Sequence, residues 1–159
     1  MCRHVINRRQ VIAFAAAAPF LAACKPQTAG PEDIRWGREV CAICGMIISE
    51  PNFAAEVRGG PDRALLKFDD IGDAVHWLAI QPWAKSPDVE FWVRDYETGT
   101  RWLDARAARY LTGVVSPMDY GFGAVETHGP DTVTFAEMEA EVLRIGLTWR
   151  CITPEEQET

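Results

Sequence analysis

Apolar residues recur at helical spacing in two segments of the chain, 69–79 and 134–145. Asp69 or Asp70 is placed to cap the first segment, and Thr134 with Glu137 forms a capping box for the second. The two apolar stripes consist of Ile71, Ala74, Val75, Leu78 and Ala79, and of Phe135, Met138, Val142 and Ile145. The pattern therefore predicts two main helices.

Shorter apolar runs bounded by turn residues predict strands. Residues 89–95 and 100–103 have the composition of a strand pair joined by a turn at 97–99. Residues 104–111, followed by Gly113, have the pattern of a short helix that ends at a glycine. We expect a mixture of small sheets and helices.

Two stretches that lie 69 residues apart resemble each other, 53–62 and 122–131. Each begins with Phe, reaches the Asp of a Gly-Pro-Asp turn nine positions later, and continues through a short segment, 63–67 or 132–134, into a predicted helix. The shared order predicts two related units, each a hairpin of short strands followed by a helix. The expected fold class is α+β, with small, mostly antiparallel sheets packed with two main helices.

Composition and charge narrow the class of protein. The chain has 159 residues, of which 48% are hydrophobic and 25% charged, which is typical of one globular domain. Its formal net charge of −7 argues against a general nucleic-acid binder, which needs a basic surface. No apolar run reaches the ~18 residues that indicate a membrane-spanning helix.

The first residues have the organisation of an export signal. A basic segment containing Arg8 and Arg9 precedes the apolar stretch 11–20, which fits twin-arginine export. Leu-Ala-Ala-Cys at 21–24 resembles a lipobox, in which Cys24 becomes the acylated first residue of the mature chain. We therefore expect an anchor to the membrane through lipid on Cys24, on the periplasmic side.

This reading divides the chain into four parts. Residues 1–23 form the export signal, and residues 24–37 form the lipidated cysteine and a flexible tether rich in Pro, Gly and small polar residues. We expect residues 38–151 to form the globular domain and residues 152–159 to form a C-terminal tail.

Sulfur-bearing residues occur in two predicted loops, Cys41-Ala-Ile-Cys44-Gly-Met46 and Ser-Pro-Met118. Thiolates and thioethers suit Cu(I), whereas Mg²⁺ and Ca²⁺ prefer oxygen donors. Gly45 permits a tight bend, so that Cys44 and Met46 both turn toward one ion. If the two units face each other, the two loops form one Cu(I) site.

Other interpretations of the same residues remain open. A structural zinc site would need Cys41 and Cys44 to be completed by Cys151 and His128, and His128 is also a candidate copper ligand. A dithiol-redox pair normally opens a helix, and the residues after Cys44 are poor at starting one. Asp69 and Asp70 are better explained by helix capping, and His76 by a boundary position in the first helix.

The methionines and cysteines can also be interpreted without a copper site. Met46 and Met118 can be ordinary packing residues. An enzyme of the lyase type would need an acid beside its thiols, and the sequence places none next to Cys41 or Cys44.

Taken in order, the motifs resemble those of the NosL family, copper-binding lipoproteins encoded with nitrous-oxide reductase. The resemblance covers roughly residues 38–147. It is carried by the Cys24 lipobox, Cys-Ala-Ile-Cys-Gly-Met at 41–46, Phe-Asp-Asp at 68–70, Trp-Leu-Asp-Ala at 102–105 with Ala108 and Tyr110, and Ser-Pro-Met at 116–118.

The resemblance implies a fold of two ββαβ-like units related to organomercurial lyase, and a carrier in place of an enzyme. It implies a periplasm-facing chaperone that delivers Cu(I) to apo nitrous-oxide reductase with its membrane assembly machinery. Cys44 matches the central ligand of the family, and Met46 and Met118 match the methionine donors, while Cys41 is a less certain ligand. The alternative is a zinc-stabilised or dithiol-redox periplasmic lipoprotein.

Overall fold

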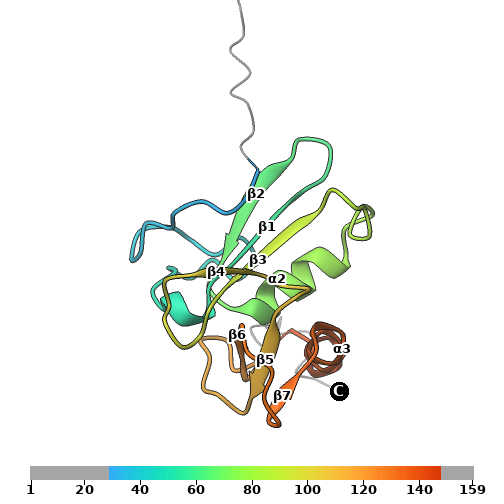
Figure 1. Ribbon diagram of the computed structural model, residues 1–159. Coiled ribbons are helices and arrows are strands. Elements are labelled where there is room, and N and C mark those ends of the chain that lie inside the picture. Colours follow the sequence, from blue (N-terminus) through green and yellow to red (C-terminus); the bar gives the residue numbers. More distant parts are fainter. Residues whose placement is uncertain (1–28, 148–159) are drawn as a thin grey trace, which may run out of the picture.

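The computed structural model describes residues 29–147 (Figure 1). The predicted export signal, Cys24, Cys151 and the predicted C-terminal tail lie outside these residues. Within them, no helix is both long enough and apolar enough to cross a membrane.

Two antiparallel sheets and two helices make up the described part, so the predicted α+β fold class is confirmed (Figure 1). The larger sheet has the strand order β2-β1-β3-β4, formed by Ala64–Phe68, Ala55–Gly59, Glu90–Arg94 and Trp102–Asp104. The smaller sheet has the order β6-β5-β7, formed by Phe122–Val125, Arg109–Thr112 and Thr132–Val133. The helices are α2 (Ile71–Ala79) and α3 (Phe135–Ile145), and a short 3₁₀ turn, η2 (Pro51–Phe53), precedes β1.

Both predicted helix starts are observed. The Asp70 side chain accepts the Gly72 N–H at the start of α2. The capping box of Thr134 and Glu137 opens α3. These caps satisfy N–H groups that have no partner within the helix, so the sequence fixes where each helix begins.

The hydrophobic core lies against the inner face of β1 and β3 and extends to α3. Val57 of β1 and Phe91 of β3 are paired in register and fully buried, as is Val75 of α2. Met138 and Val142 bring α3 into the same core. Burial of this apolar surface is the main stabilising contribution to the fold.

The predicted helix at 104–111 is wrong. The Asp104 side chain accepts the N–H groups of Arg106 and Ala107, which ends β4 in a turn. Residues 109–112 then form β5, which pairs with β6 on one side and β7 on the other. Pairing on both sides satisfies the backbone of β5 and overrides the helix propensity of the alanines and arginines in the predicted segment 104–111.

The predicted hairpin is confirmed in the first unit and wrong in the second. β1 and β2 pair directly across the Gly60 turn. β6 and β7 both pair with β5, which lies between them. In each sheet, the strand that comes first in the chain lies between the next two strands of that sheet. The two structural units are therefore β1-β2-α2-β3 and β5-β6-β7-α3.

The described part of the predicted tether, residues 29–37, lies on the outer face of the larger sheet. The Gly30 N–H donates to Glu90, and the Glu32 N–H donates to Glu56 at 2.8 Å. These bonds hold the segment against β1 and β3, so residues 29–37 are packed and not free. For residues 24–28, which are not described, the tether stays a prediction.

A short segment after β3 joins the two sheets. The Tyr96 N–H donates to the Ala124 carbonyl of β6, and Asp95 forms a parallel bridge to the same residue. The Tyr96 ring lies 2.7 Å from where a Cβ on Gly123 would be, and it also packs against Phe53. The second unit is thereby fixed beside the start of β1.

Candidate metal centre

A closed loop at residues 40–47 presents the two cysteines. The Cys41 N–H donates to the Met46 carbonyl at 2.8 Å, and the Gly45 N–H donates to the Cys41 carbonyl at 3.2 Å. Gly45 has φ +76°, a left-handed conformation that other residues rarely adopt, as its place in the loop predicted. The turn leaves Cys41 buried and Cys44 half-buried.

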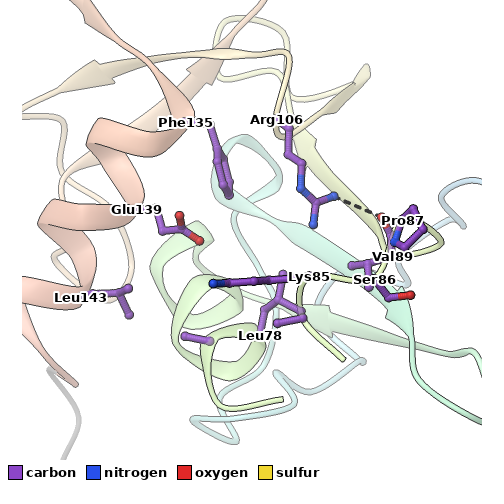
Figure 2. A pocket seen from close by; sticks show the side chains of 11 residues that line it. Leu78, Lys85, Ser86, Pro87, Val89, Arg106, Phe135, Glu139 and Leu143 are labelled. Carbon is purple, nitrogen blue, oxygen red and sulfur yellow. Dashed lines mark hydrogen bonds between the residues drawn. The ribbon is translucent and has the colours of Figure 1, made fainter. Parts of the chain in front are cut away.

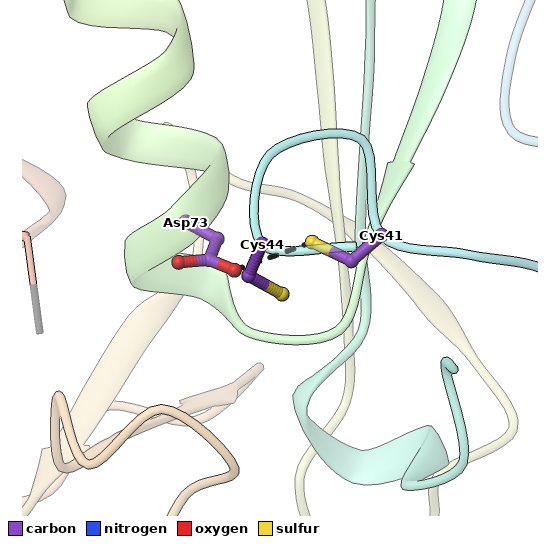
Figure 3. A group of neighbouring side chains, drawn as sticks. All are labelled: Cys41, Cys44 and Asp73. Carbon is purple, nitrogen blue, oxygen red and sulfur yellow. Dashed lines mark hydrogen bonds between the residues drawn. The ribbon is translucent and has the colours of Figure 1, made fainter. Parts of the chain in front are cut away.

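A carboxylate from α2 completes a group of three potential metal ligands. Ligand atoms of Cys41, Cys44 and Asp73 all lie within 4.8 Å of one another. The Cys41 thiol donates to Asp73 Oδ2 at 3.2 Å, and Asp73 is itself buried in the first turn of α2 (Figure 3). Residues 32 positions apart in the chain therefore meet at one point.

The environment of Cys41 contains opposing electrostatic effects. Burial raises the pKa of its thiol, because the charged form loses hydration. The backbone N–H groups of Asp69, Cys44 and Ile43 are hydrogen-bonded to its sulfur and act in the opposite direction. These donors stabilise a thiolate once a cation compensates the cost of burial.

Cys44 is held in its neutral form more strongly. Burial raises its pKa far above the ordinary thiol value, and the neighbouring Cys41 thiol and Asp73 carboxylate raise it further. The Met46 N–H acts in the opposite direction and offsets part of this rise in the pKa. Both thiols therefore favour the protonated form, and a thiophilic metal ion would displace their protons on binding.

The structure brings the second sulfur-bearing loop to the same helix end. The Met118 N–H donates to Asp70 Oδ2 at 3.0 Å, and Met118 is only 7% exposed. Asp70 lies one turn before Asp73 on α2. Met46, at the rim of the cysteine loop, is 45% exposed. The two loops predicted to form one site thus converge on the start of α2, while the roles of Met46 and Met118 as ligands stay predictions.

The two histidines differ in their positions. His128 lies in the exposed segment between β6 and β7, outside the group of three ligands. His76 is half-buried on α2, and its ring centroid lies 5.5 Å from that of Tyr120, two residues after Met118. Of the two, only His76 is on the helix that carries Asp73.

Asp73 was not among the ligands predicted from the sequence. The sequence places no acid next to the thiols, but the fold brings Asp73 beside them. The signal was present, because Asp73 lies between Gly72 and Ala74 within the apolar stripe of α2. A carboxylate in such a position must be paired, since an isolated buried charge is very costly. The helical pattern does not indicate which group pairs with the Asp73 carboxylate; in the structure it is the Cys41 thiol.

A cavity of about 600 Å³ lies elsewhere, between α2, the segment 84–89 and α3 (Figure 2). Its wall includes the apolar side chains of Leu78, Phe135 and Leu143, and Arg106 at its edge donates to the Val89 carbonyl. None of the predicted sulfur ligands lines it. The cavity and the thiol–carboxylate group are therefore separate features.

No protein-family model matches the sequence, and no curated protein matches it. Among solved structures, the chain is similar to the copper chaperone NosL from Shewanella denitrificans, with a TM-score of 0.50 and 20% sequence identity. The match covers 75% of this chain and 88% of that protein. The protein therefore has a NosL-like fold, as the sequence motifs implied, combined with a thiol–carboxylate group that can hold a metal ion.

Proposed function

We propose that the protein is a copper chaperone that holds Cu(I) at the start of α2 and passes it to apo nitrous-oxide reductase. The observation that carries this proposal is the meeting of Cys41, Cys44 and Asp73, with the Met118 loop bonded to the same helix end. The NosL-like fold supports it. Copper is the cargo of such a protein and not a resident cofactor.

In this proposal Cys44 is the central ligand, because the residue is half-buried, whereas Cys41 is buried. Met46 and Met118 supply neutral thioethers, which hold Cu(I) without competing with protons. Cys41 lies deeper, hydrogen-bonded to Asp73. It supplies a second sulfur or orients the carboxylate.

The N-terminal sequence motifs support a location of this activity at a membrane. Export through a twin-arginine signal and acylation of Cys24 would hold the domain on the periplasmic side, near the membrane machinery that assembles nitrous-oxide reductase. Because Cu(I) accepts low coordination numbers, a ligand of the partner can bind the ion before a ligand of the chaperone leaves it.

Replacing the central ligand tests the proposal. Cys44→Ser should weaken Cu(I) binding by more than the roughly 10–100-fold that loss of an outer partner of a metal ligand costs. Met46→Ile and Met118→Ile should weaken it less, because each removes one neutral donor. Anaerobic competition titration against a chromogenic Cu(I) chelator measures these affinities.

Cys151→Ser, which removes a thiol outside the loop, is the matched control and should leave the affinity unchanged. An unchanged affinity in Cys44→Ser would refute the assignment. Wild-type affinity should rise with pH, because binding displaces a thiol proton.

Metal analysis distinguishes copper from zinc. Two thiols and a carboxylate are also a donor set that Zn²⁺ accepts. X-ray absorption of anaerobically purified protein reports the metal, its oxidation state and the number of sulfur ligands. Zinc at the site, together with unfolding on chelation, would favour the zinc-stabilised lipoprotein.

The position of Asp73 also favours a second candidate, a thiol–acid enzyme of the lyase type. Two thiols can hold a thiophilic centre while the neighbouring carboxyl group gives a proton to its leaving carbon. Incubation with an organomercurial compound and excess free thiol tests this. Catalytic release of the hydrocarbon would establish an enzyme, and its absence would leave the carrier.

A further inference from the structure

We propose that Asp69 and Asp70 act together as a clamp of positioning residues that holds the cysteine loop and the Met118 loop against the start of α2. The inference rests on the proposed function, because it concerns how the two sulfur-bearing loops are kept in register for one ion. Nothing in the sequence motif itself assigns these acids a role beyond helix capping.

The two carboxylate oxygens of Asp70 serve different parts of the molecule. Oδ1 accepts the Gly72 N–H at 2.8 Å, which is the helix cap. Oδ2 accepts the Met118 N–H at 3.0 Å, across 48 positions of the chain. The Ser116 side chain is hydrogen-bonded to the same carboxylate. One side chain therefore ties the methionine loop to α2.

Asp69 holds the other loop. Its Oδ1 accepts the Ser49 N–H at 3.2 Å, just after the cysteine loop, and its own backbone N–H is hydrogen-bonded to the Cys41 sulfur. Both side chains are buried, with Asp69 1% exposed and Asp70 0%. Adjacent residues thus bind the two loops, one from each structural unit.

Capping alone does not account for this arrangement. A cap needs one side-chain oxygen, and neutral Asn or Ser caps a helix as well as Asp does. Burying a carboxylate is costly unless its oxygens are satisfied, and here the remaining oxygen is satisfied by the Met118 loop. The contact is close, because the Tyr120 ring lies 2.2 Å from where a Cβ on Gly72 would be.

The clamp matters because a thioether is a weak, neutral ligand. It adds to Cu(I) affinity only if it is held near the thiols before the ion arrives, since ordering a loop during binding costs free energy. Loss of the hydrogen bond between Asp70 and the Met118 N–H should therefore remove the contribution of Met118 to Cu(I) affinity and leave that of Cys44.

Asp70→Asn separates the clamp from the cap. Asn still offers one oxygen to Gly72, but an amide NH₂ replaces the oxygen that accepts the Met118 N–H. We expect Cu(I) affinity to fall by the same factor as in Met118→Ile, in the roughly 10–100-fold range of outer-shell partners. The double variant should lose no more than either single variant, and X-ray absorption should show one sulfur fewer.

Asp104→Asn is the matched control. Its oxygen also accepts backbone N–H groups in a turn, but from Arg106 and Ala107, so affinity and sulfur count should not change. Ser116→Ala, which leaves the cap intact, is the second variant if Asp70→Asn does not fold, and it should lower affinity in the same direction by a smaller factor.

Additive losses in the double variant, or a full sulfur count in Asp70→Asn, would overturn the clamp while leaving the proposed function standing. Absence of Cu(I) binding in the wild-type protein would overturn both. Faster hydrogen exchange at the Met118 amide in Asp70→Asn, with exchange at Gly72 unchanged, is the copper-free signature expected of the clamp.

Discussion

Glu56 lies in the centre of the larger sheet, on the face opposite α2, with its side chain fully buried. Its Oε2 accepts the Glu32 N–H, and its Oε1 lies 3.9 Å from Lys67 Nζ. Burial raises its pKa to about 7, and the nearby lysine only partly offsets this. The N-terminal segment is therefore held by a carboxyl group that is costly to ionise.

This residue gives a pH-dependent stability. Because the folded-state pKa of Glu56 lies above its ordinary value of 4.5, the folded protein binds the proton more tightly than the unfolded chain does. Stability should therefore fall as pH rises from about 4.5 to 7, as the buried group becomes charged. Glu56→Gln keeps an acceptor for Glu32 and removes the charge.

We expect Glu56→Gln to be more stable than wild type at pH 8, by roughly 1–3 kcal/mol, and similar to it at pH 4.5. Urea unfolding at the two pH values measures the difference. Glu126→Gln, at an exposed position, is the control and should show little change. A Glu56→Gln variant that is less stable than wild type at pH 8 would contradict the prediction.

Arg94 is a second buried charged residue on the same face of the larger sheet. Its guanidinium lies 4.2 Å from the ring centroid of Trp102 and 5.4 Å from that of Trp36. Planar cations stack favourably on indole rings. Trp36 and Trp102 thus cover an arginine near Glu56, and both rings are partly buried against the hydrophobic core.

At the scale of elements, α2 organises the candidate site. Its first turn carries the cap at Asp70, the glycine that the Tyr120 ring packs against, and the Asp73 carboxylate. Both units therefore meet on one helix end. A change in this turn should affect the docking of the Met118 loop more than it affects the helix itself.

Gly72→Ala is the corresponding test. Alanine favours helix by about 1 kcal/mol over glycine, but its Cβ would lie 2.2 Å from the Tyr120 ring. We expect the clash to dominate, with a net destabilisation of about 1–3 kcal/mol. Denaturant unfolding measures this value.

Gly129→Ala serves as its control, because a Cβ there meets only Thr132 at 3.8 Å. It should change stability little. A stabilised Gly72→Ala variant would mean that the Tyr120 loop moves aside freely, contrary to the packing described above.

The elements also show what a pattern of side chains can predict. The starts of α2 and α3 follow from capping residues and apolar spacing, which act within a few residues of chain. The strand β5 could not be found in this way, because the alanines at 105, 107 and 108 just before it favour helix and only pairing with β6 and β7 makes residues 109–112 a strand. The pairing partners lie too far along the chain for local spacing to indicate them.

At the scale of the whole molecule, metal binding at the candidate site would depend on folding. Its ligands come from the loop at 40–47 and from α2, and they meet only when the larger sheet and the helix are packed together. A ligand that binds only the folded state stabilises it by about 2.7 kcal/mol at a concentration 100 times its dissociation constant.

We therefore expect anaerobic Cu(I) to raise the thermal midpoint of the wild-type protein, increasingly with free Cu(I) concentration. Calorimetry or circular dichroism measures the shift. The same titration of Cys44→Ser should give almost none, and an equal shift in both proteins would place the stabilising ion elsewhere.

The sequence by itself determined the α+β class, the two capped helices, the turn at Gly45 and the presence of two thiols in one loop, because each depends on neighbouring residues or on side-chain chemistry. Tertiary structure decided that β5 is a strand, that residues 29–37 are packed against the sheet, and that Asp73 lies beside the two thiols. These features depend on contacts between distant segments, and such contacts form only when burial of the shared core brings those segments together.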